Sequence, residues 1–558
     1  MEKEDFIDEE KHETIKRYLE AILGPEYISD DPAILECYAK DSSPSGILFG
    51  KRPEFVVLPG SAEDVAAVVR ICNRFKKPFI TGALMYQSTC TPLRPGYILI
   101  DMKRMNKIIE INEKDMYAVV EPLVTFAELN AEAQKRGLFV QTPPAGMSSV
   151  LANHLFAGFT QLSWRFGIST RNILAFEWVL PTGEIVKTGS LNSGSWIWGE
   201  GPGPDLRGLI KGLFGVGSGL GIVTKMAVKL HRWPGPRDFT KCVKSSSPYV
   251  DNAWKGGWRM EFNPPPDKIR NYIIAYPSIE KLCEAIKKLG EAEICASVAH
   301  LPAWFMCCES AQSQQEFWDL WNSNYYQTLG DILGPGIPAY ALFVTIAGFT
   351  SPKQLDYEEK VLTKIVEETG GKFVPKDSRI YYEMITCYFA GEIWRPAGAK
   401  NMRPRGSFVP TRFIFESVEN AARIYRYLYK WTVEAASAHN LLYPSEGGLG
   451  DFGHFGLIAS YDFGHMIHVA GFNMYYDQSD FEQVENVRKV MKKGLEDDIE
   501  KGIGVSYAPR IPEVHAVVGP MLYNYHILLL KVKKTLDPNN IANPPFPIEV
   551  NEPLGKSG

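Results

Sequence analysis

The stretch "FGVGSGLGIVTKMAVKLHRWP", residues 214–234, joins a run of glycines to a strand-like pattern. Glycines stand at 215, 217, 219 and 221, side chains then alternate in character, and Pro234 ends the run. Backbone that carries no side chains can lie closely against a large polar object. Glycines also allow two strands to cross at short range. This stretch alone leaves both explanations open.

The bulk properties indicate an ordinary globular protein of two domains. The chain has 558 residues, 45% of them hydrophobic and 22% charged, with a net charge of −5. This net charge does not indicate the basic surface that a nucleic-acid-binding protein would need. The polar N-terminus lacks a signal sequence, and the best apolar run, 339–349, is too short to span a membrane. Nine cysteines without a C-x-x-C pair favour reduced, mostly buried thiols and a cytoplasmic location.

The first part of the chain alternates strands and helices. "FVVLPG" (55–60) predicts a strand, and Ser61 with Asp64 predicts a capping box at the start of the following helix. "PFITGA" (78–83) predicts the next strand. The pattern recurs at 117–140, where Thr125 is expected to cap a helix that ends at Gly137.

After residue 234 the pattern changes to four units of a strand followed by an amphipathic helix. They cover residues 271–290, 340–370, 411–436 and 465–502. Such units suit an antiparallel sheet with helices on one face. The tail, with "TLDPNNIANPPFP", is rich in turns after a last helix.

Two further stretches have the composition of ligand-binding loops. "PPAGMSSVLANH" (143–154) exposes backbone N–H groups beside small residues, which suits phosphate oxygens, although a tight turn also explains it. "RFGISTRNILAFEWVLPTGEIVKTG" (165–189) predicts a loop and a hairpin.

The fixed order of these pieces resembles the FAD-linked oxidase superfamily of the para-cresol methylhydroxylase type. The resemblance covers about residues 40–240 and the last fifty residues. It implies an α+β fold, with a two-part FAD-binding domain (1–240, completed by 503–558) and an antiparallel-sheet substrate (cap) domain (241–502). It also implies that the polar object beside the glycine run is FAD.

The resemblance also implies which residues contact the cofactor. The family's first flavin loop is rich in glycine, whereas "TGALMYQSTC" (81–90) keeps only Gly82, so the contacts of this loop are altered. The implied cofactor-binding residues are Gly82, Ala83, Ser88, Thr89, Pro143, Gly146, Ser148, Ser149, Val150, Asn153, Gly167, Gly221, Ile222 and Val223.

Within the family, the chain most resembles the branch of vanillyl-alcohol oxidase and 4-cresol dehydrogenase. It lacks the H-x-G-D-G-N-x-H motif of the 2-hydroxyacid branch and the His and Cys of the doubly attached flavin enzymes. The resemblance implies oxidation of a para-substituted phenol or related aromatic alcohol. The phenolate is held by tyrosines and an arginine while hydride passes from the benzylic carbon to flavin N5.

The branch's catalytic residues carry over only in part. Tyr86 and Tyr507 match the two phenolate tyrosines, and Arg510 replaces an arginine expected at Ala508. Ser163 stands where the branch has a third tyrosine, and no acidic residue lies near 143–144. As alternatives to these catalytic roles, the two tyrosines are equally well explained as core or pocket-lining residues, and Arg510 is explained as one partner of a surface ion pair.

A second-domain histidine can attach the flavin covalently in this branch. His468, or else His465, roughly matches that position, with a hydrogen-bonded pocket histidine as the alternative. No metal site is expected. Two other functions stay open, a flavin dehydrogenase of a 2-hydroxyacid or other alcohol, and a flavin-bearing electron-transfer subunit. A homo-oligomer is expected, and the electron acceptor is left open among oxygen, a cytochrome or another redox protein.

Overall fold

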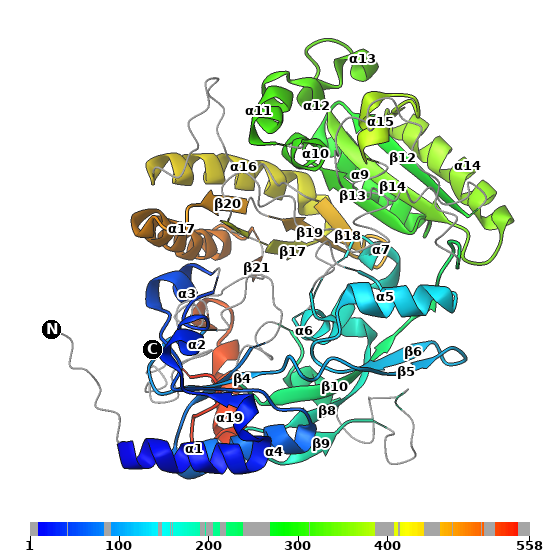
Figure 1. The fold of residues 1–558 in the computed structure, drawn as a ribbon. Coiled ribbons are helices and arrows are strands. Elements are labelled where there is room, and N and C mark those ends of the chain that lie inside the picture. Colours follow the sequence, from blue (N-terminus) through cyan, green and yellow to red (C-terminus); the bar gives the residue numbers. More distant parts are fainter. Residues whose placement is uncertain are drawn as a thin grey trace.

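We analysed a computed structural model of the 558-residue chain. It describes residues 9–41, 43–82, 91–142, 148–156, 158, 160–189, 196, 205–212, 219–237, 268–311, 313–384, 407–410, 413–439, 458–470, 473–503, 505–506 and 519–544. Three main sheets organise these residues. The two that form the blue to teal part of Figure 1 lie below the third, which is green to orange.

The first sheet has four strands in the order β1-β2-β4-β3. Strands β2 (Phe55–Val57), β4 (Ile98–Asp101) and β3 (Phe79–Gly82) are parallel, and β1 (Ile28–Ser29) is antiparallel to β2. The predicted helix is α4 (Ala62–Phe75), and α1 (Glu9–Leu23) packs against it. Ser61 caps α4 as expected, but the Asp64 carboxylate accepts from the Gly60 N–H at 2.9 Å instead of completing a capping box with Ser61.

The second sheet has five antiparallel strands in the order β5-β6-β10-β8-β9. Its central strand, β10 (Ile222–Lys229), is the strand predicted after the glycine run, and it pairs with β6 (Tyr117–Val120) and β8 (Ile173–Val179). The edges are β5 (Ile108–Asn112) and β9 (Ile185–Lys187). β8 and β9 form the predicted hairpin. Strand β10 is apolar along most of its length because apolar clusters pack on both of its faces.

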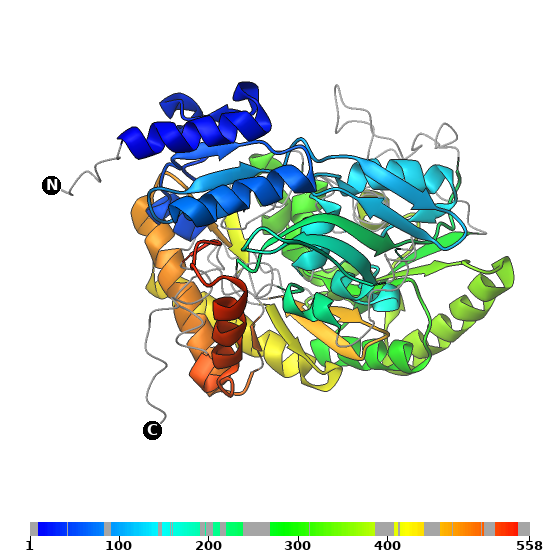
Figure 2. The ribbon, with the colours of Figure 1, turned by 90° about the horizontal axis from the view of Figure 1, so that it is seen from below.

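Three helices and a short ribbon connect this sheet to the rest of the molecule. Helix α5 (Phe126–Lys135) begins with the predicted Thr125 cap, which forms a capping box with Glu128. Helix α6 (Val150–Leu155) follows, and α7 (Ser163–Phe166) contacts the third sheet. Strands β7 (Leu138–Phe139) and β11 (His231–Arg232) form a two-stranded ribbon. Figure 2 views these elements from below.

The third sheet has eight strands in the order β15-β12-β14-β13-β18-β19-β17-β21, and every neighbouring pair is antiparallel. The strands are β12 (Ile269–Tyr276), β13 (Ser297–Leu301), β14 (Tyr340–Ala347), β15 (Lys372–Phe373), β17 (Phe413–Glu416), β18 (Ile458–Tyr461), β19 (Met466–Ala470) and β21 (Val505–Ser506). A separate pair consists of β16 (Ser407–Pro410) and β20 (Asn473–Tyr476). Each of the four predicted strand-to-helix units is present. Their helices are α9 (Ile279–Glu291), α14 (Pro352–Thr369), α16 (Ala421–Ala438) and α17 (Phe481–Glu500).

Helices cover both faces of the β12–β14–β13 part of this sheet. Tyr272 and Ile274 on β12 belong to the apolar cluster beneath α9, α14 and α16. Ile273, between them, points to the other face and belongs to a second cluster. That cluster includes residues of α10 (Ala303–Ser310), α11 (Gln314–Asn322), α12 (Tyr325–Thr328), α13 (Gly330–Leu333) and α15 (Arg379–Met384). The prediction of helices on one face is therefore incomplete, because these short helices were not foreseen.

The end of the chain returns to the first sheet. Helix α19 (Tyr525–Leu536) precedes residues 541–543, which bond to β3 through Phe79 N–H to Ile541 O (2.8 Å) and Asn543 N–H to Phe79 O (2.7 Å). In Figure 1, α19 accordingly lies among the blue elements. Strand β21 lies beyond the predicted boundary at 502 and still pairs with β17. The domain division itself stays a prediction.

Candidate functional site

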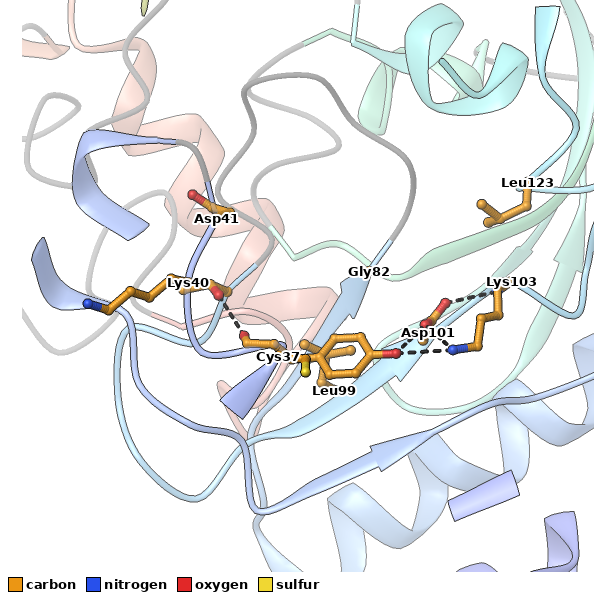
Figure 3. Close-up of a pocket in the computed structure, with 10 residues that line it drawn as sticks. Cys37, Lys40, Asp41, Gly82, Leu99, Asp101, Lys103 and Leu123 are labelled. Carbon is orange, nitrogen blue, oxygen red and sulfur yellow. Dashed lines mark hydrogen bonds and ion pairs between the residues drawn. The ribbon is translucent and has the colours of Figure 1, made fainter. Parts of the chain in front are cut away.

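A cavity of about 310 Å³ opens at the carboxyl ends of two parallel strands (Figure 3). Gly82 ends β3 and Asp101 ends β4, and both line it. Ligands of open parallel sheets bind at such strand ends. The lining residues are Cys37, Tyr38, Lys40, Asp41, Gly82, Thr91, Leu99, Asp101, Lys103 and Leu123. Its size is at the lower end of the range of ligand pockets.

A hydrogen-bonded polar group forms one wall of this cavity. The Tyr38 hydroxyl donates to Asp101 Oδ2 at 2.8 Å, and Lys103 Nζ lies 3.2 Å from the same carboxylate oxygen. Lys103 Nζ also donates to the Tyr38 hydroxyl at 3.1 Å. Burial raises the pKa of Tyr38, while Lys103 opposes the shift. The wall thus offers a protonated hydroxyl, a carboxylate and an ammonium group, which suits a ligand with hydroxyl or phosphate groups.

Apart from Gly167 and the two histidines, the predicted cofactor residues that the structure describes fall into three segments. Gly82 ends β3, residues 148–153 include the start of α6, and residues 221–223 lead into β10. The other predicted residues of the first two loops lie outside the described residues, namely Ala83, Tyr86, Ser88, Thr89, Pro143 and Gly146. The same holds for Tyr507 and Arg510.

The chain between β6 and α5, residues 121–125, connects the three segments. Val150 N–H donates to Val124 O at 2.9 Å, and the Ser149 hydroxyl donates to Pro122 O. Leu123 lines the cavity beside Gly82 and packs in one apolar cluster with Ile222. The strand end, the start of α6 and the start of β10 therefore meet around this connection.

The glycines at 219 and 221 are explained by protein contacts. Gly221 has φ of +115°, and a Cβ there would collide with Val179 O and the Trp178 ring. Gly219 has φ of +66°, and a Cβ there would collide with Ala542 O. The protein thus fills the Cβ side of both glycines, and the glycines permit the close crossing of segments that the sequence left as the alternative. Contact of FAD with their backbone stays a prediction.

Other predicted site residues have structural partners as well. Ser149 caps α6 by accepting from Ala152 N–H at 3.1 Å, so its hydroxyl is engaged as donor and acceptor. Gly167 has φ of +74° and lies at the end of α7, close to Asp462. Ser163, at the position of the branch's third tyrosine, is buried and accepts from Thr160 N–H at 3.0 Å.

The two histidines considered for covalent attachment differ in position. His465 lies in the turn between β18 and β19 and its side chain is exposed, which argues against a bond to a buried ring. His468 lies within β19, and its backbone is in register with Phe415 of β17 and Ala459 of β18. Only the backbone of His468 is described. Of the two, His468 keeps the role as a prediction.

The described residues fit a large polar cofactor. Asn153 Oδ1 and Gln161 Oε1 are buried without a hydrogen-bond partner among the described residues, and both lie in the predicted cofactor segment 143–172. Buried polar atoms of this kind are ordinarily satisfied by protein, water or ligand. Together with the hydroxyl, carboxylate and ammonium of the cavity, they match the hydroxyl, phosphate and ring groups of FAD. No group of three or more potential metal ligands is found within the described residues.

Comparisons with known proteins bear on the same segments. The sequence profile of the FAD binding domain matches residues 53–189, which include β2, β3, α6 and the β8–β9 hairpin. The chain therefore contains an FAD-binding domain, as the resemblance to the FAD-linked oxidase superfamily implied. The predicted family, fold class and cofactor are thereby confirmed.

Individual known proteins are similar to this chain over different lengths. D-lactate dehydrogenase [cytochrome] from Arabidopsis thaliana is 25% identical over 58% of this chain and 59% of its own length. The 4-cresol dehydrogenase [hydroxylating] flavoprotein subunit from Pseudomonas putida is 31% identical over 31% of this chain and 34% of its own length. The chain thus spans less than two thirds of the length of either curated relative. The crystal structure of p-cresol methylhydroxylase with substrate bound covers 98% of this chain and 99% of its own, with a TM-score of 0.73 and 18% identity.

Several residues of the candidate site were not foreseen. Tyr38, Asp101 and Lys103 were not among the predicted site residues, although an acid directly after the buried run "ILI" (98–100) is a recognisable signal. Gln161 carried no signal at all. Four described cysteines, Cys72, Cys283, Cys295 and Cys307, are free and buried, whereas Cys37 is free and exposed. No described helix is long and apolar enough to cross a membrane.

Proposed function

We propose that this chain is an FAD-dependent oxidoreductase that removes a hydride from a para-substituted phenol or related aromatic alcohol. One observation carries the proposal. The likeness to p-cresol methylhydroxylase runs over 98% of the chain and so includes both the FAD-binding domain and the eight-stranded sheet. The names of the curated relatives are names of enzymes, in agreement with an enzymatic role. Bound FAD supplies the hydride acceptor.

The chain's own residues would hold the cofactor from two sides. The loop after Gly82, with Ala83, Ser88 and Thr89, and the segment of Pro143, Gly146 and Ser148 would surround the phosphates. Lys103 and Tyr38 would add a cation and a hydroxyl from the cavity, where they are already held by Asp101. A cation with fixed partners binds phosphate without first having to be ordered.

Two tyrosines and an arginine would hold the substrate oxyanion. Tyr86 belongs to the loop that leaves β3 after Gly82, and Tyr507 directly follows β21. Strand β21 pairs with β17 in the third sheet and β3 belongs to the first, so the described strands that precede the two tyrosines in sequence lie in different sheets. Donors from both would stabilise a phenolate in a dry pocket, with Arg510 as the charge partner. A phenolate releases electron density to its para carbon, which lets hydride depart.

His468 would attach the flavin covalently. The support is its place in β19, with strands paired on both sides, since a fixed backbone suits a permanent bond. Acid precipitation tests this. A yellow pellet supports the bond, and colour that stays entirely in the supernatant contradicts it.

Anaerobic reduction of the flavin tests the proposed function. Bleaching by para-substituted phenols, but not by 2-hydroxyacids, supports it. Bleaching by D-lactate or another 2-hydroxyacid alone would select the second candidate function, which the 25% identity to a D-lactate dehydrogenase favours. If neither phenols nor 2-hydroxyacids reduce the flavin, the remaining candidate function is that of a flavin-bearing electron-transfer subunit.

The remaining features of the proposal concern the whole protein. We infer a small-molecule substrate, a homo-oligomer and a cytoplasmic location, with residues 1–240 and 503–558 forming the FAD-binding domain and 241–502 the cap. The acceptor is oxygen, a cytochrome or another redox protein, and reoxidation rates with each would distinguish them.

A further inference from the structure

A buried polar seam lies between α6 and α7. Its side chains come from Gln141, Thr160, Gln161, Ser163 and Ser169, each less than a tenth exposed. Four of them bond to one another. Gln141 Nε2 donates to Ser169 Oγ at 3.5 Å, the Thr160 hydroxyl donates to Gln141 Oε1 at 3.4 Å, and Ser163 Oγ accepts from Thr160 N–H at 3.0 Å.

Gln161 is the exception in this seam. It is 4% exposed, and its Oε1 is buried without a hydrogen-bond partner among the described residues. A primary amide taken out of water without a partner is unfavourable, whichever way its oxygen and nitrogen are assigned. The protein therefore keeps one donor and one acceptor side by side at this position, ready for a group from outside the chain.

The backbone holds this amide in place. Ser163 N–H donates to Thr160 O at 3.0 Å, which closes a turn around Gln161 and Leu162. Leu162 is fully buried in the apolar cluster that also contains Phe343 of the third sheet. The turn is thus anchored where the FAD-binding part meets the eight-stranded sheet, and Gln161 is not free to swing out to solvent.

Other unpartnered buried polar atoms have less suitable surroundings. His154 Nε2 and His231 Nε2 also lack hydrogen-bond partners in the described part of the chain, but aromatic rings lie beside both, with Phe126 next to His154 and Phe166 next to His231. Asn153 lies against Gly158 and is only half-buried. Compared with these three residues, Gln161 combines a buried position, a backbone held in a turn and a side chain with both a donor and an acceptor.

We propose that the side-chain amide of Gln161 pairs with the imide edge of the isoalloxazine ring of FAD. That edge has one N–H, at N3, flanked by two carbonyl oxygens. A primary amide complements it with two hydrogen bonds, because its oxygen accepts from N3–H while its NH₂ donates to a neighbouring carbonyl. The proposal rests on FAD binding and is independent of the phenol substrate.

A double-mutant-type cycle tests this pairing, in which the protein variant and the cofactor are each changed and the binding affinities are compared. Apoprotein is titrated with FAD and with N3-methyl-FAD, which lacks the N3–H. We expect the wild type to prefer FAD about tenfold, the usual loss for one buried neutral hydrogen bond. Gln161→Met, of similar length and without polar atoms, should bind FAD about tenfold more weakly and lose the preference for it over N3-methyl-FAD.

The matched control is Gln327→Met. Gln327 also has an unpartnered Oε1, but it lies in α12, where its Nε2 donates to Trp321 O at 2.8 Å. This variant should keep the tenfold preference. An equal preference in Gln161→Met and wild type would overturn the proposal, whereas wild-type protein that binds no FAD at all would overturn the assignment of the domain instead.

A second measurement does not require cofactor exchange, so it also serves if the flavin is covalently bound. The infrared carbonyl bands of the oxidised flavin should move to higher frequency in Gln161→Met, because one carbonyl loses a hydrogen-bond donor. Should Gln161→Met not fold, Gln161→Glu keeps an acceptor for N3–H and removes the NH₂ donor. It should keep the preference for FAD and still shift the carbonyl band, and unchanged bands in the folded variant would contradict the pairing.

Discussion

Replacing Lys533 by methionine should release the C-terminal segment from the FAD-binding domain. The side chain of Lys533 is fully buried, and its Nζ donates to Gly219 O at 3.0 Å, Ala542 O at 2.5 Å and Asp537 Oδ2 at 2.7 Å. Asp537 is 1% exposed and accepts from Ile541 N–H at 3.1 Å and Ala542 N–H at 2.9 Å. This ion pair therefore ties α19, the glycine run and residues 541–542 together.

The cost of the change follows from what it leaves behind. Methionine preserves the apolar stem but leaves the Asp537 carboxylate buried without its cation and two carbonyls without a donor. Breaking a buried pair by removing one partner costs about 3–5 kcal/mol. Lys533→Met combined with Asp537→Asn removes the stranded charge, so the double variant should regain about half of that loss.

Native-state hydrogen exchange measures the loss directly, because a protein of this size is not expected to unfold in one step. The opening free energy of the amides of Ile541 and Ala542 should fall by about 3–5 kcal/mol in Lys533→Met. Lys534→Met is the control, since Lys534 is the exposed neighbour and should change it by less than about 0.5 kcal/mol. A loss below about 1 kcal/mol in Lys533→Met would refute the reasoning, because it would mean that water or a neighbour replaces the ammonium group.

Three further predictions concern the same domain and its chemistry. Gly221→Val should lower the yield of folded protein and its unfolding temperature, because a side chain at φ +115° collides with Val179 O, and a normally stable variant that merely lacks flavin would contradict this. Burial lowers the pKa of His154 to about 4, so between about pH 6.5 and 4 the unfolded chain binds a proton that the folded chain does not. The free energy of unfolding should therefore decrease by up to about 3 kcal/mol as the pH is lowered through that window. In His154→Gln, the free energy of unfolding measured with urea should depend less on pH over the same window. Tyr507→Phe should slow flavin reduction by a phenol about 100-fold while the flavin stays bound, and an unchanged rate in stopped-flow absorbance would end the oxyanion role.

Local signals in the sequence sufficed for much of the fold. Ser61 and Thr125 marked the starts of α4 and α5, because a capping side chain needs only its own first turn. The four strand-to-helix units were visible for the same reason, since period and polarity are local properties. The short helices α10–α13 were missed, because one or two turns give too few positions to show a helical period.

The candidate site depended on contacts that a single sequence does not reveal. Tyr38 and Asp101 are 63 positions apart, and only the fold brings the hydroxyl to the carboxylate. Likewise, the glycine run showed that close approach was required at 219 and 221 but not which atom approaches. The family resemblance supplied FAD as a neighbour of this stretch, and the structure adds that protein carbonyls and the Trp178 ring fill the Cβ side of these two glycines.

The glycine crossing is connected through packing to the cavity where the cofactor is proposed to bind. Ala542, which lies against Gly219, belongs to the same apolar cluster as Ile222 and Leu123. Leu123 in turn lines the cavity beside Gly82. Closely packed protein interiors transmit a displacement at one end to the other, because their side chains have little free volume in which to relax. The C-terminal segment, although it contributes no residue to the cavity, therefore fixes the position of the wall against which the cofactor is proposed to bind, and loosening it at Lys533 should weaken FAD binding as well as the fold.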